Sequence, residues 1–187
     1  QVKPLPSEFM EAVRISIITH QFSNPEKPVT RLRYTKMSYL QRRHLGEDIS
    51  EYKRLAAGPY NPKARYKGPE PIAVKNKYIV AQQGDTAFIT GPSIEKAMAY
   101  ATNYWPASAF EWLNQFEGYS DEHLELIATV DHAMLELARN GKPFTLANVK
   151  QIIHDEPNWR PKLSKSVFRD SYIERAIEKL LKILSFD

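Results

Sequence analysis

The chain has 187 residues, of which 42% are hydrophobic and 26% are charged, and it contains no cysteine. These proportions are typical of a globular protein that can bury a core, and they exclude an intrinsically disordered chain. Without cysteine there are no disulfides and no thiolate metal sites, which favours a reducing, cytoplasmic location. No apolar run is long enough to cross a bilayer, so we expect no membrane partner. Because the chain starts at Gln1, we expect a processed piece or an excised domain of a larger protein.

The net charge of +4 is unevenly distributed along the chain. Residues 1–78 hold 15 Lys and Arg residues against 7 Asp and Glu residues, whereas residues 79–187 hold 11 against 15. A basic first part beside an acidic second part favours a nucleic acid or an acidic protein as the partner of the first part. Docking of the two parts on each other would account for the same asymmetry.

Apolar residues at helical spacing predict helices over residues 8–22, 29–44 and 48–57. Ser7 is the expected N-cap of the first helix, Gly46 ends the second, and Gly58 with Pro59 stops the third. A short helix is expected over residues 70–76. Residues 78–81 and 87–90 flank a glycine-containing turn and predict a β-hairpin. Three helices followed by a hairpin is the element order of a winged-helix unit, although the short helix at 70–76 is an extra element.

The remaining residues predict helices alone. One helix starts at Pro92-Ser93 and another at Pro106. A third runs over residues 121–139 with Ser120 as N-cap, a fourth follows Thr145, and the last closes the chain over residues 166–184. The fold class is therefore mainly α with a small β-hairpin. We expect a basic, winged-helix-like lobe over residues 1–91 and a helical lobe over residues 92–187, or one compact domain that contains both.

The expected second helix is strongly basic. Its apolar residues are predicted to face inward, and its cations are predicted to form an outer face able to contact phosphates. A merely soluble helix face is the alternative. The cations of this helix are Arg31, Arg33, Lys36, Arg42 and Arg43.

A rigid basic loop follows over residues 56–71, with four prolines and two glycines. Gly58, Pro59 and Tyr60 are the residues expected to set its course, because proline fixes φ and glycine permits unusual turns. Lys63, Arg65 and Lys67 recur at every second position, so an extended backbone would place all three on one side. The alternative is a solvated connector that only stiffens a helix junction.

We find no pattern of catalytic chemistry. His123 and His132 lie nine residues apart on one expected helix and therefore point to opposite sides, so they cannot share a metal ion. Phosphate-binding glycine loops and a serine-nucleophile elbow are also missing. Trp112 and Phe116 fit a helical core stripe better than a base-stacking platform. We therefore expect no catalytic residue, metal, cofactor or small-molecule substrate.

Three segments carry a resemblance to a known group of proteins. They are Ala56-Ala57-Gly58-Pro59-Tyr60-Asn61-Pro62, Ile127-Ala128-Thr129-Val130 and Asn158-Trp159-Arg160-Pro161-Lys162. Together with the basic helix before them, they make residues 28–187 resemble the accessory C-terminal region of type I restriction–modification proteins. More distantly, the chain resembles the C-terminal domain of DarG antitoxins, which follows a macrodomain and neutralises a DNA-modifying ADP-ribosyltransferase.

The resemblance implies a non-catalytic helical module in prokaryotic DNA defence. Methyltransferase, helicase, target-recognition and macrodomain motifs are absent, so no activity is implied for this chain. The favoured function is a module that binds duplex DNA weakly and without sequence preference, or assembles with other subunits of a restriction–modification complex. The alternatives are a protein-interaction domain that blocks a toxin's DNA-binding site and a purely structural linker.

Overall fold

The computed structural model describes residues 6–65 and 68–187. In these residues the chain is mainly helical, with 61% helix in eight helices and a small antiparallel sheet, which confirms the expected fold class. Contacts between Cα atoms group the residues into two compact units. Unit 1 comprises residues 1–41 and 61–117, and unit 2 comprises residues 42–60 and 118–187. This grouping differs from the expected boundary at residue 91, because each unit contains two separate stretches of chain.

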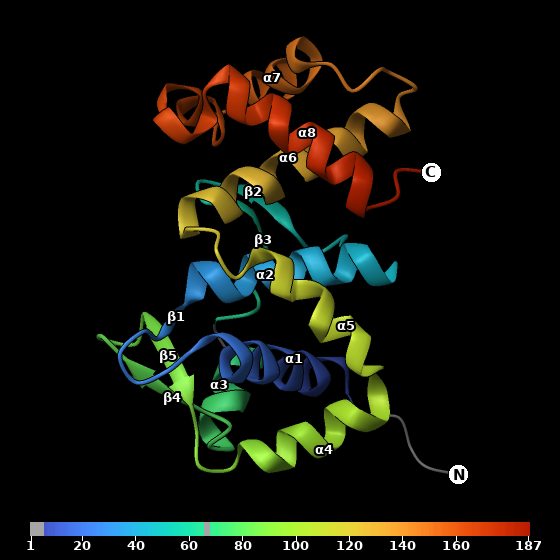
Figure 1. The fold of residues 1–187 in the computed structure, drawn as a ribbon. Helices are drawn as coiled ribbons and strands as arrows, with labels where there is room; N and C mark the ends of the chain where they lie inside the picture. Colours follow the sequence, from blue (N-terminus) through green and yellow to red (C-terminus); the bar gives the residue numbers. More distant parts are fainter. Residues whose placement is uncertain (1–5, 66–67) are drawn as a thin grey trace. The chain divides into compact units, whose positions relative to one another are not determined.

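Unit 1 combines helices with a three-stranded antiparallel sheet (Figure 1). Helix α1 packs against α3, α4 and strand β5, and the sheet has the order β1-β5-β4. Its core includes Val13, Ile18, Met37 and Phe88, which are at most 1% exposed. The elements are α1 (Ser7–Phe22), β1 (Val29–Thr30), the first part of α2 (Arg31–Leu45), α3 (Pro69–Lys75), β4 (Ile79–Gln82), β5 (Ala87–Thr90), α4 (Ile94–Tyr104), α5 (Ala107–Glu111) and the 3-10 helix η1 (Trp112–Phe116).

In chain order unit 1 contains α1, β1, the first part of α2, α3, β4 and β5, and β5 lies in the middle of the sheet. Val29 pairs with Phe88, and Ile79 pairs with Thr90, so one strand from before α2 joins the predicted hairpin. The short helix predicted over residues 70–76 is α3, which packs on α1.

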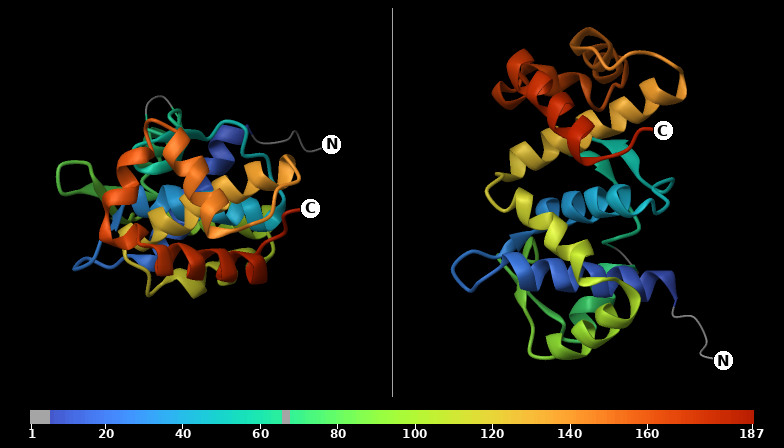
Figure 2. Two further views of the ribbon diagram at one scale, coloured as in Figure 1. Left: turned by 90° about the horizontal axis from the view of Figure 1, so that it is seen from above. Right: turned by 45° about the vertical axis from the view of Figure 1, so that its right-hand side comes forward.

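Unit 2 is built on the long helix α6 (Asp121–Arg139), against which α7 and α8 pack (Figure 2). The predicted N-caps are confirmed here: the Ser120 hydroxyl accepts from the His123 backbone N–H at 3.1 Å, and Thr145 caps α7 in the same way. Trp159 is fully buried in this unit. The other elements are β2 (Lys53–Leu55), β3 (Gly58–Tyr60), α7 (Leu146–Asp155), η2 (Arg160–Ser164), η3 (Ser166–Phe168) and α8 (Asp170–Ile183).

The helix predicted over residues 48–57 is wrong, because residues 53–55 and 58–60 form the hairpin β2–β3. Gly58, which was expected to stop that helix, adopts a φ of 105° and is the first residue of β3. Two side chains from distant sequence donate to carbonyls of this hairpin: Trp159 Nε1 donates to Leu55 O at 2.8 Å, and Lys162 Nζ donates to Ala56 O. Tertiary hydrogen bonds therefore hold this segment in a hairpin where local spacing predicted a helix.

Two boundary predictions also need adjustment. Helix α1 begins at Ser7, with Pro6 at the N-cap position and no side-chain cap, so Ser7 is not the cap. Gly46 does end α2, as predicted, with a φ of 70°. Phe116 is fully buried, whereas Trp112 is only half-buried, so the predicted core stripe of η1 is confirmed for Phe116 and is partial for Trp112.

Candidate nucleic-acid interface

Arg31 opens α2, but its guanidinium is bound within unit 1. Its Nε and Nη2 atoms contact the two carboxylate oxygens of Glu70 at 2.7 and 3.0 Å, and Nη2 also donates to Asp85 O at 2.6 Å. Tyr34 donates to the same carboxylate at 2.8 Å. A bidentate ion pair of this kind is directional and partly desolvated, so it holds α2 to α3. Arg31 is thus committed to the fold.

The expectation that Arg33 and Lys36 face outward is wrong. Arg33 is 8% exposed, and its Nη2 atom donates to Phe116 O at 3.2 Å and Glu117 O at 3.0 Å. Lys36 is fully buried. An interior cation needs polar partners to offset its desolvation. These two side chains therefore lie in the interior of unit 1 and do not present charge to a partner.

Arg42 and Arg43 belong to unit 2, where both have acidic or carbonyl partners. Arg42 Nη1 lies 3.7 Å from a Glu47 carboxylate oxygen and donates to Asp48 O at 3.1 Å. Arg43 contacts both carboxylate oxygens of Asp131 and donates to Ser185 O at 2.9 Å. The predicted outer basic face of α2 is therefore largely neutralised within the protein. Sequence reasoning missed the acidic partners, because Glu70 and Asp131 are distant from α2 along the chain.

The basic loop keeps exposed cations. Lys63 and Arg65 are exposed, whereas Lys67 lies outside the described residues. The loop is packed against the start of α3, because the Glu70 backbone N–H donates to Ala64 O at 3.0 Å. A Cβ atom at Gly68 would lie 1.9 Å from Lys63 O, so only glycine permits this approach. The backbone that bears Lys63 and Arg65 is therefore held at one end of α3.

The structure differs from the predicted loop at Gly58, Pro59 and Tyr60. They form strand β3 and pair with Leu55, Arg54 and Lys53 respectively. Gly58 and Pro59 are buried, and Tyr60 is half-buried. Their conformational role is thus to close the hairpin of unit 2.

Two further exposed cations lie at the other end of α3. Lys75 is in the last turn of this helix, and Lys77 follows it with a φ of 60°. A helix of seven residues rises about 10 Å, so about this distance separates the two cationic ends. The lysines of residues 70–77 were visible in the sequence, but only the fold shows that α3 has exposed cations near both of its ends. The exposed cations of the site are thus Lys63, Arg65, Lys75 and Lys77.

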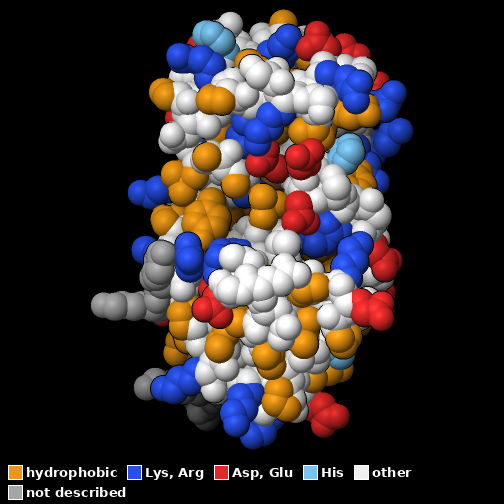
Figure 3. Space-filling model, turned by 90° about the vertical axis from the view of Figure 1, so that its left-hand side faces the viewer, with side chains coloured by type: hydrophobic (Ala, Val, Ile, Leu, Met, Phe, Trp, Pro, Cys, Tyr) orange, Lys and Arg blue, Asp and Glu red, His pale blue; other side chains and the backbone are white. Residues whose placement is uncertain are grey.

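Charge is mixed on the one face that Figure 3 draws. On the face drawn in Figure 3, Lys and Arg side chains occur singly or in small groups, with Asp and Glu side chains among them. Within residues 6–65 and 68–187, no three His, Asp or Glu side chains gather as a metal site would require. None of the helices in the described part of the chain has the length and apolarity needed to cross a membrane.

Comparison of the sequence with models of protein families finds no match, and comparison with curated proteins finds none either.

Proposed function

We propose that the chain is a non-catalytic module that binds duplex DNA weakly and without sequence preference through the cations around α3. The observation that carries the proposal is the placement of Lys63 and Arg65 at one end of α3 and of Lys75 and Lys77 beyond its other end. Phosphate contacts require exposed Lys or Arg side chains on a fixed frame, and they carry no sequence information by themselves. The setting in a prokaryotic restriction–modification system is proposed from the resemblance alone.

The cations of α2 play a different part in this proposal from the one that the sequence suggested. Removing Arg31 from Glu70 would take the counter-charge from a buried carboxylate, and removing Arg33 would break its bonds to Phe116 O and Glu117 O, so duplex binding at these residues would oppose folding. We therefore assign the interface to the basic loop and to α3, and we assign the cations of α2 to contacts within the protein.

A salt titration tests the proposal. Fluorescence anisotropy of a labelled duplex is measured with the whole chain at several salt concentrations. If about four phosphates are neutralised, log K against log salt is linear with a slope of about −3 to −4. The Lys63→Glu, Arg65→Glu double variant is expected to lose most of the binding and to make the slope shallower by about two.

The matched control reverses two exposed cations of unit 2, Lys142 and Lys182, to Glu. It changes the net charge by the same amount but leaves the α3 region intact. It should keep most of the wild-type affinity. Equal losses in the two double variants would show only a general charge effect, and absence of wild-type binding at low salt would refute duplex binding.

A second candidate function is assembly with a protein partner, including a toxin that the chain would block. One observation favours it: unit 1 has a mainly apolar groove of about 440 Å³ along α1, α4 and α5, lined by Ile17, Met98, Trp105 and Phe110 among others. Met98 is 41% exposed and Tyr104, on the same helix, is 58% exposed. A mainly apolar groove with an exposed side chain such as Met98 is typical of interaction surfaces. If the duplex titration fails, this candidate leads.

A further inference from the structure

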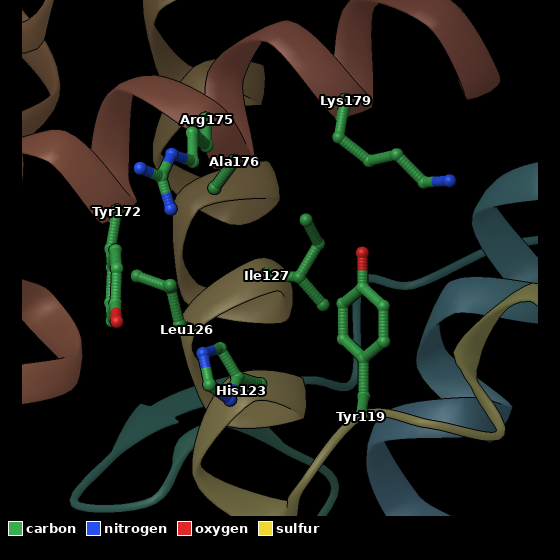
Figure 4. Close-up of a pocket in the computed structure, with 8 residues that line it drawn as sticks. All are labelled: Tyr119, His123, Leu126, Ile127, Tyr172, Arg175, Ala176 and Lys179. Carbon is green, nitrogen blue, oxygen red and sulfur yellow. The ribbon is translucent and has the colours of Figure 1, made fainter.

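Unit 2 contains a small cavity between α6 and α8 that the proposed DNA interface does not use. It has a volume of about 220 Å³ and a floor made by the buried side chains of Leu126, Ile127 and Ala176. Figure 4 shows that its walls come from three places: the segment that leads into α6, the first turns of α6, and α8. The cavity is smaller than the usual drug-sized site, so it suits one planar ring system.

Three aromatic rings surround this floor. The ring centroids of Tyr119 and His123 are 6.2 Å apart, and those of His123 and Tyr172 are 5.7 Å apart. The Ser120 hydroxyl lies 2.9 Å from His123 Nδ1 and thereby fixes the imidazole. The guanidinium carbon of Arg169 lies 4.2 Å from the Tyr172 ring centroid, on a side chain that does not line the cavity. The rings are thus held by neighbours within unit 2.

The cavity is positively charged. Arg175 and Lys179 extend from α8 beside the floor, and no acidic side chain is among the lining residues (Figure 4). Burial raises the pKa of Tyr119, so its hydroxyl stays protonated at neutral pH and adds no negative charge. An aromatic cavity with two cations and no carboxylate favours a ligand that joins a planar apolar group to an anion.

We infer that this cavity binds one nucleotide, with the base against Leu126 and Ile127 among the three rings and the phosphate on Arg175 and Lys179. A nucleobase is planar and stacks on aromatic side chains irrespective of its identity. A paired base is not accessible to such a cavity, so the ligand is a free nucleoside monophosphate or an unpaired nucleotide of a strand. This inference concerns unit 2 and does not depend on duplex binding by unit 1.

The test uses half-ligands. Binding of deoxyadenosine monophosphate to the whole chain is measured by isothermal titration calorimetry, together with binding of deoxyadenosine and of deoxyribose 5-phosphate. Because base and phosphate each contribute, we expect the nucleotide to bind at least about tenfold more tightly than either half, which corresponds to 1.4 kcal/mol. A decamer of deoxyadenosine then distinguishes the sources: tighter binding per site than the mononucleotide indicates a strand, and equal binding indicates the free nucleotide.

Variants locate the site. Tyr172→Ala and Arg175→Glu should each weaken nucleotide binding by about fivefold or more. The control is Lys182→Glu, because Lys182 lies on the same helix but outside the cavity. This substitution makes the same charge change as Arg175→Glu and should not weaken nucleotide binding. Circular dichroism confirms that each variant is folded, and Lys179→Glu replaces any variant that is not.

Three results would overturn the inference. They are the absence of saturable nucleotide binding at millimolar concentration, equal affinity for deoxyribose 5-phosphate and the nucleotide, and an equal loss in Lys182→Glu. The Lys63→Glu, Arg65→Glu protein should bind the mononucleotide like the wild type. Failure at the cavity is therefore distinguishable from failure of duplex binding.

Discussion

Arg43 and Asp131 form a bidentate ion pair between the end of α2 and the middle of α6. The Nε–Oδ2 distance is 2.8 Å, and the Nη2–Oδ1 distance is 3.1 Å. The Asp131 side chain is fully buried, and that of Arg43 is 10% exposed. Arg43 also lies with its guanidinium carbon 4.9 Å from the Phe186 ring centroid. A cation that was predicted to contact a partner is thus the counter-charge of an interior carboxylate.

Replacing Arg43 with Ala should destabilise the protein by about 3–5 kcal/mol, because it leaves the Asp131 carboxylate buried without its partner. Chemical denaturation at pH 7 measures the change. Arg42→Ala is the matched control, since Arg42 is the adjacent residue and its pair with Glu47, at 3.7 Å, is more exposed. That control should cost no more than about 1 kcal/mol. Similar losses in the two variants would contradict the importance of the buried pair.

His132 should make the stability depend on pH. Burial, together with the charges of Arg54, Arg139 and Arg43, lowers the pKa of His132 to about 4. Its Nδ1 atom accepts from Arg54 Nε at 3.1 Å, which requires the neutral ring. Between about pH 6.5 and pH 4 the unfolded chain binds a proton that the folded chain does not, so stability falls as the pH falls through this range, by on the order of 3 kcal/mol in total.

Denaturant titrations at intervals from pH 7 to pH 4.5 measure this effect. His132→Gln removes the titrating ring and keeps an acceptor for Arg54, so its stability should change less steeply with pH than that of the wild type. Parallel slopes for the two proteins would show that other groups cause the acid sensitivity.

Gly91→Ala should destabilise unit 1. A Cβ atom at this position would lie 2.3 Å from Lys77 O and 2.8 Å from Tyr78 C, and both are backbone atoms that cannot rotate away. Backbone displacement of this kind costs about 1–3 kcal/mol. Gly118 is the control, because a Cβ atom there meets nothing within 4 Å and its φ is not in the left-handed region. Thermal unfolding should show a lower Tm for Gly91→Ala and no decrease for Gly118→Ala.

Trp159→Phe should weaken the hairpin β2–β3. The substitution keeps an aromatic ring in the core but removes the donor to Leu55 O, which is left without this bond. The expected loss is about 1–3 kcal/mol. Hydrogen exchange of residues 53–60 should accelerate more than that of α7. Unchanged exchange in the hairpin would show that the hydrogen bond does not support it.

Helices were predictable where local signals agree. The bounds of α6 follow from its apolar spacing and from Ser120, and β4–β5 follow from apolar segments around Gly84. The hairpin β2–β3 was not predictable, because its carbonyls are bound by Trp159 and Lys162, about a hundred residues away along the chain. The predicted outward orientation of the α2 cations was wrong for the same reason, because their partners are also distant along the chain. Of the four cations in the candidate interface, the sequence singled out Lys63 and Arg65, which are exposed in the structure, but not Lys75 and Lys77.

The division of the chain into units restricts how it can be shortened. The boundary between the units falls within α2, after Gln41, and the chain crosses it again after Tyr60 and after Glu117. A fragment that starts at residue 92 would retain Asp131 and Trp159 but would lose the arginine and the carbonyl that they bind. A fragment that ends at residue 91 would lack α4 and α5 of unit 1. Neither unit corresponds to a contiguous gene segment, so dissecting their functions requires point substitutions rather than truncation.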